Sequence, residues 1–340
     1  MIQIENNISL IHYNTFGIDV KARFFCEVKT ISQLQELIQS SQYRDTPKLM
    51  LGGGSNILFT RDFPGLIIKM EITGIDVVGE EEERITIKAG AGESWHDLVM
   101  HCVHRDWGGI ENLSLIPGTV GAAPIQNIGA YGVEIASLIE KVEGIDSSTG
   151  TLQSFNKDEC RFEYRESTFK VELKEKIFIS SVTLSLSKKN HHFNIHYGAI
   201  RETLKQQHVD QVTVKAVSDA VIRIRQSKLP DPKMIGNAGS FFKNPTITPD
   251  HFRKLQNTNP SIPSYPSDNH NVKVSAAWLI EQCGWKGKQL NNVGVHPLHA
   301  LVIVNYGGGT GAEILDLAMQ IKTSVKEKFD VSLTPEVNIF

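Results

Sequence analysis

Alternating apolar and polar positions predict strands through most of the first half of the chain. Two helices interrupt these strands. Thr30 is placed to cap a helix over residues 32–40, and Ser94 with Asp97 resembles a capping box for a helix that ends near His104. The predicted strands cover residues 22–29, 48–51, 66–70, 75–78, 85–89, 141–145 and 177–186. The first half is therefore strand-rich.

Beyond about residue 190 the pattern changes to helical periods mixed with short strands. Helices are predicted before Pro230, over 275–283, and after Thr310, where Thr310 and Glu313 resemble a capping box. Strands are predicted over 300–305 and 333–340. The apolar helix faces consist of Val217, Ala220, Val221 and Ile224 before Pro230, and of Ile314, Leu317, Ala318, Ile321 and Val325 after Thr310. This pattern predicts an α+β second domain.

Residues 108–134, called the central stretch below, carry no charged side chain between Glu111 and Glu134. Prolines 117 and 124 with several glycines would break a membrane-spanning helix, so we expect no membrane span. Glycine lets backbone N–H groups approach a large ligand closely, because no Cβ intervenes. The stretch therefore predicts a ligand-binding loop, and a buried structural loop remains the alternative.

A second glycine-rich loop, residues 52–56, follows directly after the predicted strand 48–51. Its three consecutive glycines permit positive φ and expose successive N–H groups, which suits a pyrophosphate. The loop is neither a G-x-G-x-x-G fingerprint nor a P-loop. From its pattern alone a hairpin turn is an equally good interpretation.

Composition favours small-molecule chemistry. The 340 residues are enough for two or three domains, and the net charge of -3 comes with mixed signs and no basic stripe, so we expect no nucleic-acid partner. The four cysteines never form C-x-x-C, which argues against a disulfide framework or a zinc site. The amino terminus has no basic start followed by an apolar run, so we expect no signal peptide and a cytoplasmic protein.

Two further patterns carry no predicted function. The acidic run 80–83 indicates an exposed hairpin tip, since a run of like charges is usually a solvated face. His96 and His101 are five residues apart on a predicted helix, and no carboxylate or cysteine completes a ligand set with them and His104. We therefore interpret these histidines as ordinary helix residues and predict no metal site.

Five separated motifs resemble the UDP-N-acetylenolpyruvoylglucosamine reductase family, in its longer type, along essentially the whole chain. They are residues 51–56 (Leu-Gly-Gly-Gly-Ser-Asn), 116–132, 164–167 (Tyr-Arg-Glu-Ser), 236–245 and 335–337 (Pro-Glu-Val). The resemblance implies an α+β protein with an FAD-binding domain of the vanillyl-alcohol-oxidase (PCMH) type over 1–190, in lobes of about 1–70 and 71–190. It also implies a substrate-binding domain over 191–330 and a strand over 331–340 that returns to the flavin site.

The resemblance places FAD along both glycine-rich loops. Because residues 52–56 contain no histidine for covalent attachment, we expect dissociable FAD. Ala122 and Ala123 stand where family members carry hydroxyl residues, so backbone amides would have to replace any side-chain contact there. The cofactor-binding residues implied are Gly52, Gly53, Gly54, Ser55, Asn56, Pro117, Gly118, Gly121, Ala122, Asn127, Gly129, Ala130 and Gly132.

The implied reaction has two halves, in which NADPH reduces FAD and reduced FAD then reduces an enolpyruvyl double bond, with ping-pong kinetics. Arg165 would stabilise the substrate carboxylate as negative charge grows on it. Ser240 would protonate the carbanion, with Lys228 or Lys243 stabilising its alkoxide. Glu336 would act as the acid, its pKa raised by burial or a like charge, or would stay ionised and orient Arg165.

The implied substrate is UDP-N-acetylglucosamine enolpyruvate, an intermediate of peptidoglycan synthesis, and we expect a monomer. Its contacts would be Tyr164, Tyr197, Lys228, Asn244 and Tyr265, the last in a loop over residues 261–266 that closes on the UDP portion. Without the resemblance, Arg165 fits a surface salt bridge, Ser240 a turn and 261–266 a linker. Two other functions stay open, namely an oxygen-using oxidase on the same scaffold and a binding module without turnover.

Overall fold

The structure, a computed structural model, describes residues 2–197, 199–266 and 271–340, and the chain divides into two compact units. The first unit contains the chain up to Ile8, Ala22–Gly53 and Pro64–Ser227, and the second contains Ser9–Lys21, Gly54–Phe63 and Lys228–Phe340. The first unit thus includes residues 191–227, which the sequence analysis assigned to a substrate-binding domain. The functional boundary near residue 190 stays a prediction.

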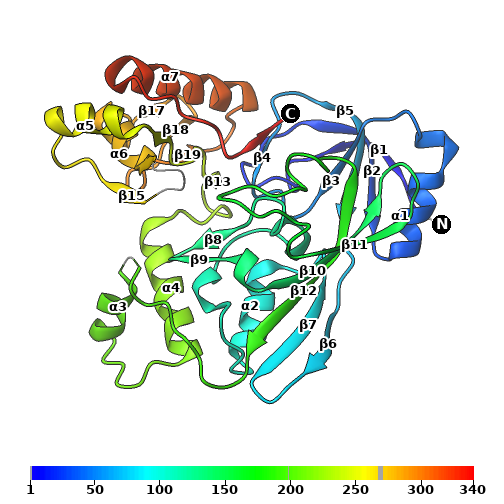
Figure 1. The fold of residues 1–340 in the computed structure, drawn as a ribbon. Helices are drawn as coiled ribbons and strands as arrows, with labels where there is room; N and C mark the ends of the chain where they lie inside the picture. Colours follow the sequence, from blue (N-terminus) through cyan, green and yellow to red (C-terminus); the bar gives the residue numbers. More distant parts are fainter. Residues whose placement is uncertain (1, 198, 267–270) are drawn as a thin grey trace. The chain divides into compact units, whose positions relative to one another are not determined.

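The amino-terminal part of the first unit is a four-stranded sheet with strand order β1-β2-β5-β3 (Figure 1). Strands β3 and β5 are parallel, with Leu49 opposite Ile67. Thr30 caps the helix that follows β2, because its side chain accepts from the Gln33 N–H at 3.2 Å, which confirms the predicted N-cap. The elements are β1 (Glu5–Ser9), β2 (Lys21–Val28), α1 (Ile31–Gln39), the 3₁₀ helix η1 (Ser41–Tyr43), β3 (Lys48–Leu51) and β5 (Phe63–Met70).

A five-stranded sheet with the order β11-β10-β12-β7-β6 forms the rest of the first unit's β-structure, and Figure 1 shows its strands side by side. Its neighbouring strands are antiparallel. The central strand β12 is buried along its whole length except at Ser187, so both faces of the sheet are covered there. The strands are β6 (Ile75–Glu80), β7 (Arg84–Gly90), β10 (Ile139–Asp146), β11 (Leu152–Asn156) and β12 (Ile177–Ser187).

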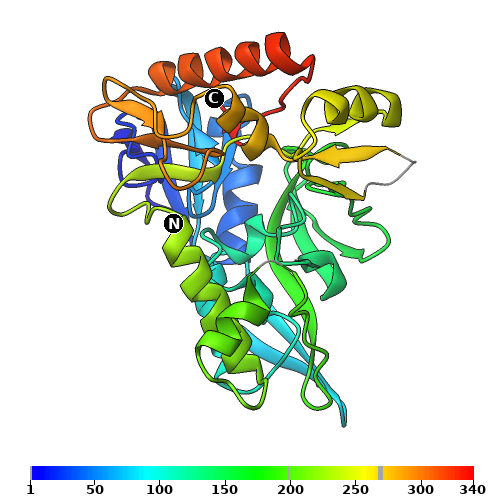
Figure 2. The ribbon, with the colours of Figure 1, turned by 90° about the vertical axis from the view of Figure 1, so that its left-hand side faces the viewer.

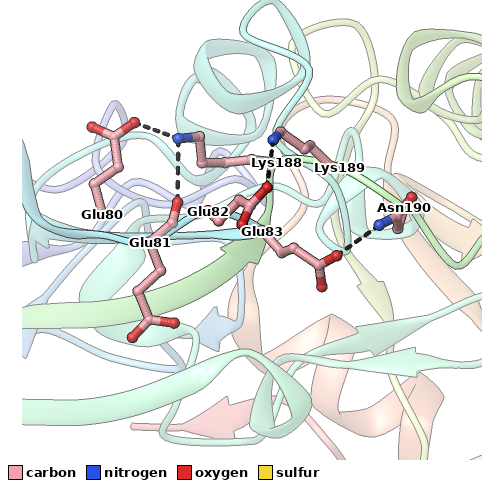
Figure 3. Close-up of polar contacts among 7 residues, drawn as sticks. All are labelled: Glu80, Glu81, Glu82, Glu83, Lys188, Lys189 and Asn190. Atoms are coloured by element: carbon pink, nitrogen blue, oxygen red, sulfur yellow. Dashed lines mark hydrogen bonds and ion pairs between the residues drawn. The ribbon is translucent and has the colours of Figure 1, made fainter.

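The acidic run 80–83 begins at the last residue of β6 and continues through the turn to β7, which confirms the predicted hairpin tip. Its side chains contact residues that follow β12, an arrangement that the sequence analysis did not expect (Figure 3). Exposed ion pairs contribute only about 0–1 kcal/mol each, so they fix the tip weakly. The contacts are Glu80 with Lys188, Glu82 with Lys189 at 3.4 Å, and Glu83 with Asn190 at 2.7 Å.

Two helices late in the first unit pack on each other (Figure 2). They are α3 (Ile200–Gln206) and α4 (Val214–Lys228), whose last residue belongs to the second unit. The face predicted for α4, formed by Val217, Ala220, Val221 and Ile224, is buried, which confirms it. The remaining elements of this unit are α2 (Trp95–Val103), η2 (Glu111–Leu113), η3 (Val120–Ala122), β8 (Gly129–Ala130), β9 (Val133–Glu134) and η4 (Ile135–Ser137).

The second unit contains a sheet of order β13-β19-β18-β17, along which α7 lies (Figure 2). A three-stranded sheet, β14-β16-β15, and a parallel pair, β4 with β20, complete it. Its strands are β4 (Ile57–Leu58), β13 (Gly236–Ser240), β14 (Thr246–Ile247), β15 (Ser264–Pro266), β16 (Val272–Val274), β17 (Gln289–Leu290), β18 (Val293–Val295), β19 (Val302–Asn305) and β20 (Asn338–Ile339). Its helices are α5 (Pro249–Thr258), α6 (Ala276–Gln282) and α7 (Gly311–Phe329).

The helix signals in this unit were more accurate than the strand signals. The capping box of Thr310 and Glu313 is present at the start of α7, and Ser275 caps α6. The strand predicted over 333–340 is wrong in its extent, since only Asn338–Ile339 is a strand. Pro335 lacks an N–H and forms only an isolated bridge with Phe242. Among the described residues no helix is both long and apolar enough to cross a bilayer.

Candidate active site

In the first unit, Gly52 and Gly53 of one glycine-rich loop lie against Gly118 and Thr119 of the other. A Cβ on Gly53 would be 2.9 Å from the Cα of Gly118, and a Cβ on Gly52 would be 2.4 Å from Oγ1 of Thr119. Real Cβ atoms do not approach other atoms so closely, so only glycine fits at these two positions. Gly53 and Gly118 remain open to solvent on their other sides, being exposed and partly exposed respectively. The loops thus form a backbone-lined cradle, which fits a bound pyrophosphate.

Asn127 fixes the middle of the central stretch. This residue is 1% exposed and has a φ of +44°, a left-handed conformation that asparagine tolerates. Its Nδ2 donates to Oε2 of Glu134 at 2.8 Å and to the carbonyl of Glu163 at 3.0 Å, and its Oδ1 accepts from the Ala136 N–H at 3.1 Å. The side chain of Asn127 therefore stabilises the conformation of the central stretch, independently of any role in ligand binding.

Asn112 connects the start of the central stretch to its end. Its Nδ2 donates to the carbonyl of Tyr131 at 3.0 Å and to that of Asn194 at 2.7 Å. Its Oδ1 is buried and has no hydrogen-bond partner among the described residues. An unsatisfied buried acceptor is costly, so we expect a bound water or ligand donor to satisfy it in solution. Sequence reasoning did not single out Asn112.

Arg165 lies against the central stretch. Its Nη2 donates to the carbonyl of Gly129 at 2.8 Å, its Nη1 to that of Asn127 at 3.4 Å, and its guanidinium carbon is 5.7 Å from the ring centre of Tyr164. Arg165 has a φ of +58°, which is strained for a residue with a side chain. The structure thus brings Arg165 and Tyr164 together with the predicted cofactor loop. The predicted contact Tyr197 also belongs to this unit and is 49% exposed.

Ser240 and Glu336 lie on adjacent segments of the second unit. Ser240 ends β13, and the next residue but one, Phe242, bridges to Pro335. The N–H of Glu336 donates to the carbonyl of Phe241 at 2.8 Å. The structure therefore brings these two predicted catalytic residues together through main-chain bonds.

The other predicted residues of the second unit are spread around this point. Oδ1 of Asn244 accepts from the Ala276 N–H at 3.0 Å and so helps to begin α6. Lys228 is exposed at the end of α4, and Tyr265 is 39% exposed on β15, where it pairs with Lys273. Asn56, also in this unit, donates from Nδ2 to the carbonyl of Glu336 at 3.3 Å.

Three residues that sequence reasoning did not assign to the site lie at the central stretch. Arg225 on α4 donates from Nε to the carbonyl of Leu115 at 3.2 Å, and burial lowers the pKa of its guanidinium. Nδ1 of His96 accepts from the N–H of Leu115 at 3.0 Å. Tyr131 has a φ of +50°, and burial raises the pKa of its phenol. A polar residue at the edge of the apolar face of α4 was the one signal that could have indicated Arg225.

Other clusters do not form a competing site. Ser187 Oγ is 2.7 Å from Nδ1 of His191, whose Nε2 is 3.4 Å from Asp106; the backbone of Gly108 packs directly against Ser187 and His191, and none of these residues is a predicted site residue. A surface hollow of about 400 Å³ beside β10 and β11 includes none of the predicted site residues. The described residues contain no group of three or more potential metal ligands. The four cysteines are unpaired.

The comparisons with known proteins first define a class. A family model described as an FAD binding domain matches residues 22–156, which include both glycine-rich loops. The fold agrees, since the crystal structure of UDP-N-acetylenolpyruvylglucosamine reductase from Thermus caldophilus superposes with a TM-score of 0.70 at 23% identity, covering 100% of both chains. A solvent-stable cholesterol oxidase superposes with a TM-score of 0.52 at 11% identity over 98% of this chain and 87% of its own. The chain is thus an FAD-binding α+β oxidoreductase of the PCMH type.

The particular family follows from sequence. A model of the C-terminal domain of UDP-N-acetylenolpyruvoylglucosamine reductase matches residues 231–340. A curated relative of that name from Amoebophilus asiaticus is 51% identical over 338 residues, covering 99% of both chains. Another from Flavobacterium johnsoniae is 43% identical over 99% of this chain and 100% of its own. The chain belongs to the UDP-N-acetylenolpyruvoylglucosamine reductase family, as the sequence motifs indicated.

Proposed function

We propose that this protein reduces UDP-N-acetylglucosamine enolpyruvate to UDP-N-acetylmuramate with NADPH as hydride donor and non-covalently bound FAD, as a cytoplasmic monomer in peptidoglycan precursor synthesis. The observation that carries the proposal is the adjacency of Ser240 and Glu336 within the part of the chain that matches the reductase C-terminal domain. A protein that only bound flavin would not need both groups on neighbouring segments.

FAD would be held by the residues of the two glycine-rich loops. Successive N–H groups of residues 52–56 would bind its pyrophosphate, and the backbone of residues 117–132 would lie along the rest of the molecule. The cradle between Gly53 and Gly118 supports this placement, because a side chain there would occupy the space. When bound, FAD supplies the two-electron chemistry that passes a hydride from NADPH to the substrate.

Arg165 would bind the carboxylate of the enolpyruvyl group. Hydride addition to the terminal carbon leaves a carbanion next to that carboxylate, and the guanidinium stabilises the charge that spreads onto its oxygens. Two N–H groups of Arg165 already donate to carbonyls of the central stretch, which supports a fixed orientation. A pre-oriented donor needs little reorganisation as the charge develops.

Ser240 would complete the reduction by giving the proton of its hydroxyl to the carbanion, and solvent would then replace that proton. Lys228 or Lys243 would stabilise the transient alkoxide. Glu336, fixed by its own N–H to the Phe241 carbonyl, would donate a hydrogen bond as the neutral acid or orient a cation as the carboxylate. The nucleotide sugar would be contacted by the predicted substrate-binding residues, which are Tyr164, Tyr197, Lys228, Asn244 and Tyr265. Closure of the loop over residues 261–266 would exclude water.

An anaerobic two-step titration tests the proposal. NADPH is added to the purified protein with FAD until the flavin absorbance bleaches, and the enolpyruvyl nucleotide sugar is then added. The proposal predicts bleaching and then recovery of the absorbance without oxygen. Bleaching without recovery would exclude this substrate, consumption of oxygen without NADPH would indicate an oxidase, and the absence of bleaching would indicate a binding module.

A further inference from the structure

The loop between β1 and β2 packs on two glycines from distant parts of the chain. Residues 10–18, called the amino-terminal loop below, belong to the second unit, as do Gly54 and β13. A Cβ on Gly54 would be 2.1 Å from the carbonyl oxygen of Tyr13, and a Cβ on Gly236, the first residue of β13, would be 2.3 Å from that of Phe16. Neither position has room for a side chain. The amino-terminal loop therefore contacts both the predicted pyrophosphate loop and β13.

Thr15 connects these two contacts through hydrogen bonds. Its N–H and its Oγ1 both donate to the carbonyl of Gly54, at 3.0 and 3.3 Å, and its own carbonyl accepts from the N–H of Asn237 on β13 at 2.9 Å. One chain of backbone hydrogen bonds thus runs from Gly54 through Thr15 to Asn237. Sequence reasoning assigned no role to Thr15.

Asn14 holds the amino-terminal loop in one shape around Thr15. The side chain of Asn14 is 7% exposed. Its Nδ2 donates to the carbonyls of Leu10 and Ile18 at 2.7 and 2.9 Å, and its Oδ1 accepts from the Ile18 N–H at 3.0 Å. These three bonds close the loop on itself, because they join its two ends to its middle. A shift at the N–H of Thr15 is therefore accompanied by a shift at its carbonyl.

Phe16 joins the same loop to the segment of Ser240. Its ring is 1% exposed and lies edge-on to Phe241, the residue after Ser240, with 6.5 Å between the ring centres. Its carbonyl accepts from Nδ2 of Asn305 at 2.9 Å, and Asn305 pairs with Gly236 in the ladder between β19 and β13. Both ends of β13 are thus fixed to the amino-terminal loop, directly or through the neighbouring strand.

The bonds of Thr15 also orient the peptide group between Gly54 and Ser55. In a trans peptide the C=O and the following N–H point in opposite directions. Because the Gly54 carbonyl is held toward Thr15, the Ser55 N–H points away from Thr15. Ser55 is partly exposed, and within the part of the chain that the structure describes its N–H has no hydrogen-bond partner. An N–H held in this way suits a pyrophosphate oxygen.

We propose that Thr15 is a positioning residue that couples FAD binding to the strand that carries Ser240. The inference rests on the proposed function, in that it takes the FAD pyrophosphate to lie at the glycine-rich loop after β3. An anion bound to the Ser55 N–H favours the peptide orientation in which the Gly54 carbonyl faces Thr15, and the carbonyl of Thr15 in turn holds β13. Cofactor binding then stabilises the amino-terminal loop and β13 together, which fixes the predicted proton donor when the flavin is in place.

Amide hydrogen exchange of the full-length protein, with and without saturating FAD, tests the coupling. Peptides that contain residues 52–56 report FAD at the glycine-rich loop, and peptides that contain residues 236–241 report β13. In the wild type we expect FAD to slow exchange in both by about tenfold. Thr15→Val removes the hydroxyl but keeps the shape and the backbone N–H. It should raise the FAD dissociation constant about fivefold and reduce the slowing at residues 236–241 by a similar factor, the effect of one hydrogen bond.

Two further variants serve as controls. Thr15→Ser keeps the hydroxyl and should behave as the wild type. Thr60→Val is the matched control, because Thr60 in the same unit also donates from its N–H and its Oγ1 to a single carbonyl, that of Phe340, at 2.7 Å each. It should leave the FAD dissociation constant and the exchange of residues 236–241 unchanged. Should Thr15→Val fail to fold, Thr15→Ala, which removes the same hydroxyl, decides.

The outcomes separate the coupling from the proposed function. A Thr15→Val protein with the FAD affinity and the FAD-dependent slowing of the wild type would overturn the inference. A change at residues 236–241 that is equal with and without FAD would also overturn it, since that result means a structural role alone. Slowing at residues 52–56 without slowing at 236–241 in the wild type would leave the pyrophosphate placement intact and refute the coupling. The absence of slowing at residues 52–56 would refute both. No measurement uses NADPH or the nucleotide sugar, so failure of the proposed reaction would leave the test intact.

Discussion

The two units hold their candidate site residues in different ways. In the first unit, Asn127 and Arg165 are fixed by side-chain bonds to carbonyls of the same or a distant segment. In the second unit, the segments of Ser240 and Glu336 are joined by bonds between main-chain groups, and the Phe242 to Pro335 bridge lies between them. Geometry in the first unit therefore depends on particular side chains. In the second unit it depends on bonds between main-chain groups.

The two units also differ in the backbone strain near their candidate site residues. Leu115, Asn127, Tyr131 and Arg165 all have φ between +44° and +59°, although each has a side chain. In the second unit the left-handed residue beside Ser240 is Gly239, with a φ of +69°, where glycine has no steric penalty. A left-handed residue with a side chain costs about 1–2 kcal/mol. The first unit thus maintains a strained loop by its surroundings, and its site should be the more sensitive to substitution around it.

Ser240→Ala should give the largest effect on activity with the smallest effect on structure. General-acid catalysis contributes about 10²–10⁴-fold, so we expect the turnover rate to fall by that factor. Because main-chain bonds position Ser240, the melting temperature should change by less than about 2 °C. Steady-state kinetics and thermal unfolding measure the two quantities. The control is Ser332→Ala, at an exposed serine of the same unit, and a Ser240→Ala enzyme with more than a tenth of wild-type turnover would contradict the assignment.

Asn127→Ala should show the opposite behaviour, with a large loss of stability. The substitution removes three hydrogen bonds and leaves the Ala136 N–H without its partner, whereas the Glu163 carbonyl keeps the N–H of Glu166, so the free energy of unfolding should fall by about 3 kcal/mol. The matched variant in the second unit is Asn244→Ala, which loses one bond from the Ala276 N–H and should cost about 1 kcal/mol. Urea unfolding compares the two. Equal losses of unfolding free energy would mean that the first unit does not depend on side-chain hydrogen bonds more than the second unit does.

Gly52→Ala tests whether the hydroxyl of Thr119 is the single group that prevents a side chain at residue 52. Its Cβ would meet Oγ1 of Thr119 at 2.4 Å, while the Cβ of Thr119 would be 3.6 Å away. We expect Gly52→Ala to weaken FAD binding about tenfold, which corresponds to about 1.4 kcal/mol, and Thr119→Ala to restore most of it in the double variant. Gly53→Ala should resist rescue, because its neighbour is the backbone of Gly118. Equilibrium dialysis gives the FAD dissociation constants of the wild type, Gly52→Ala, Gly53→Ala and the Gly52→Ala, Thr119→Ala double variant. A double variant that binds FAD no better than Gly52→Ala would show that Thr119 is not the obstacle.

The motifs could be recognised from sequence because the residues of each lie close together in the chain. Tyr164 and Arg165 are neighbours, and the glycines of residues 52–54 follow one another. Helix starts were equally accessible, since a cap such as Thr310 with Glu313 is a local hydrogen-bond pattern. Short strands such as β14 and β16 were missed, because two or three residues contain too little periodicity to detect.

The network around Leu115 could not be predicted in the same way. His96, Leu115 and Arg225 come from α2, a loop and α4, and the bond between Leu115 and Arg225 joins residues 110 positions apart. A histidine on a helix is usually unremarkable, and neither its neighbours nor its spacing indicates what Nδ1 accepts. The strained φ of Leu115 is equally invisible, because leucine is the wrong residue to suggest a left-handed turn. Only tertiary structure brings these signals together.

The pH dependence of stability gives the smallest of the expected effects and compares the two units once more. Burial lowers the pKa of His96 in the first unit and of His296 in the second. The unfolded chain, with a histidine pKa near 6.5, then binds more protons than the native protein, so stability is full above about pH 6.5 and falls as the pH drops toward the native values. Urea unfolding between pH 7.5 and 5 should show a shallower fall for His96→Asn and for His296→Asn than for wild type. His104→Asn should leave the slope unchanged, since His104 is exposed. An unaltered slope in His96→Asn would mean that the fold does not hold His96 neutral. That result would also contradict the assignment of His96 Nδ1 as the acceptor of the Leu115 N–H.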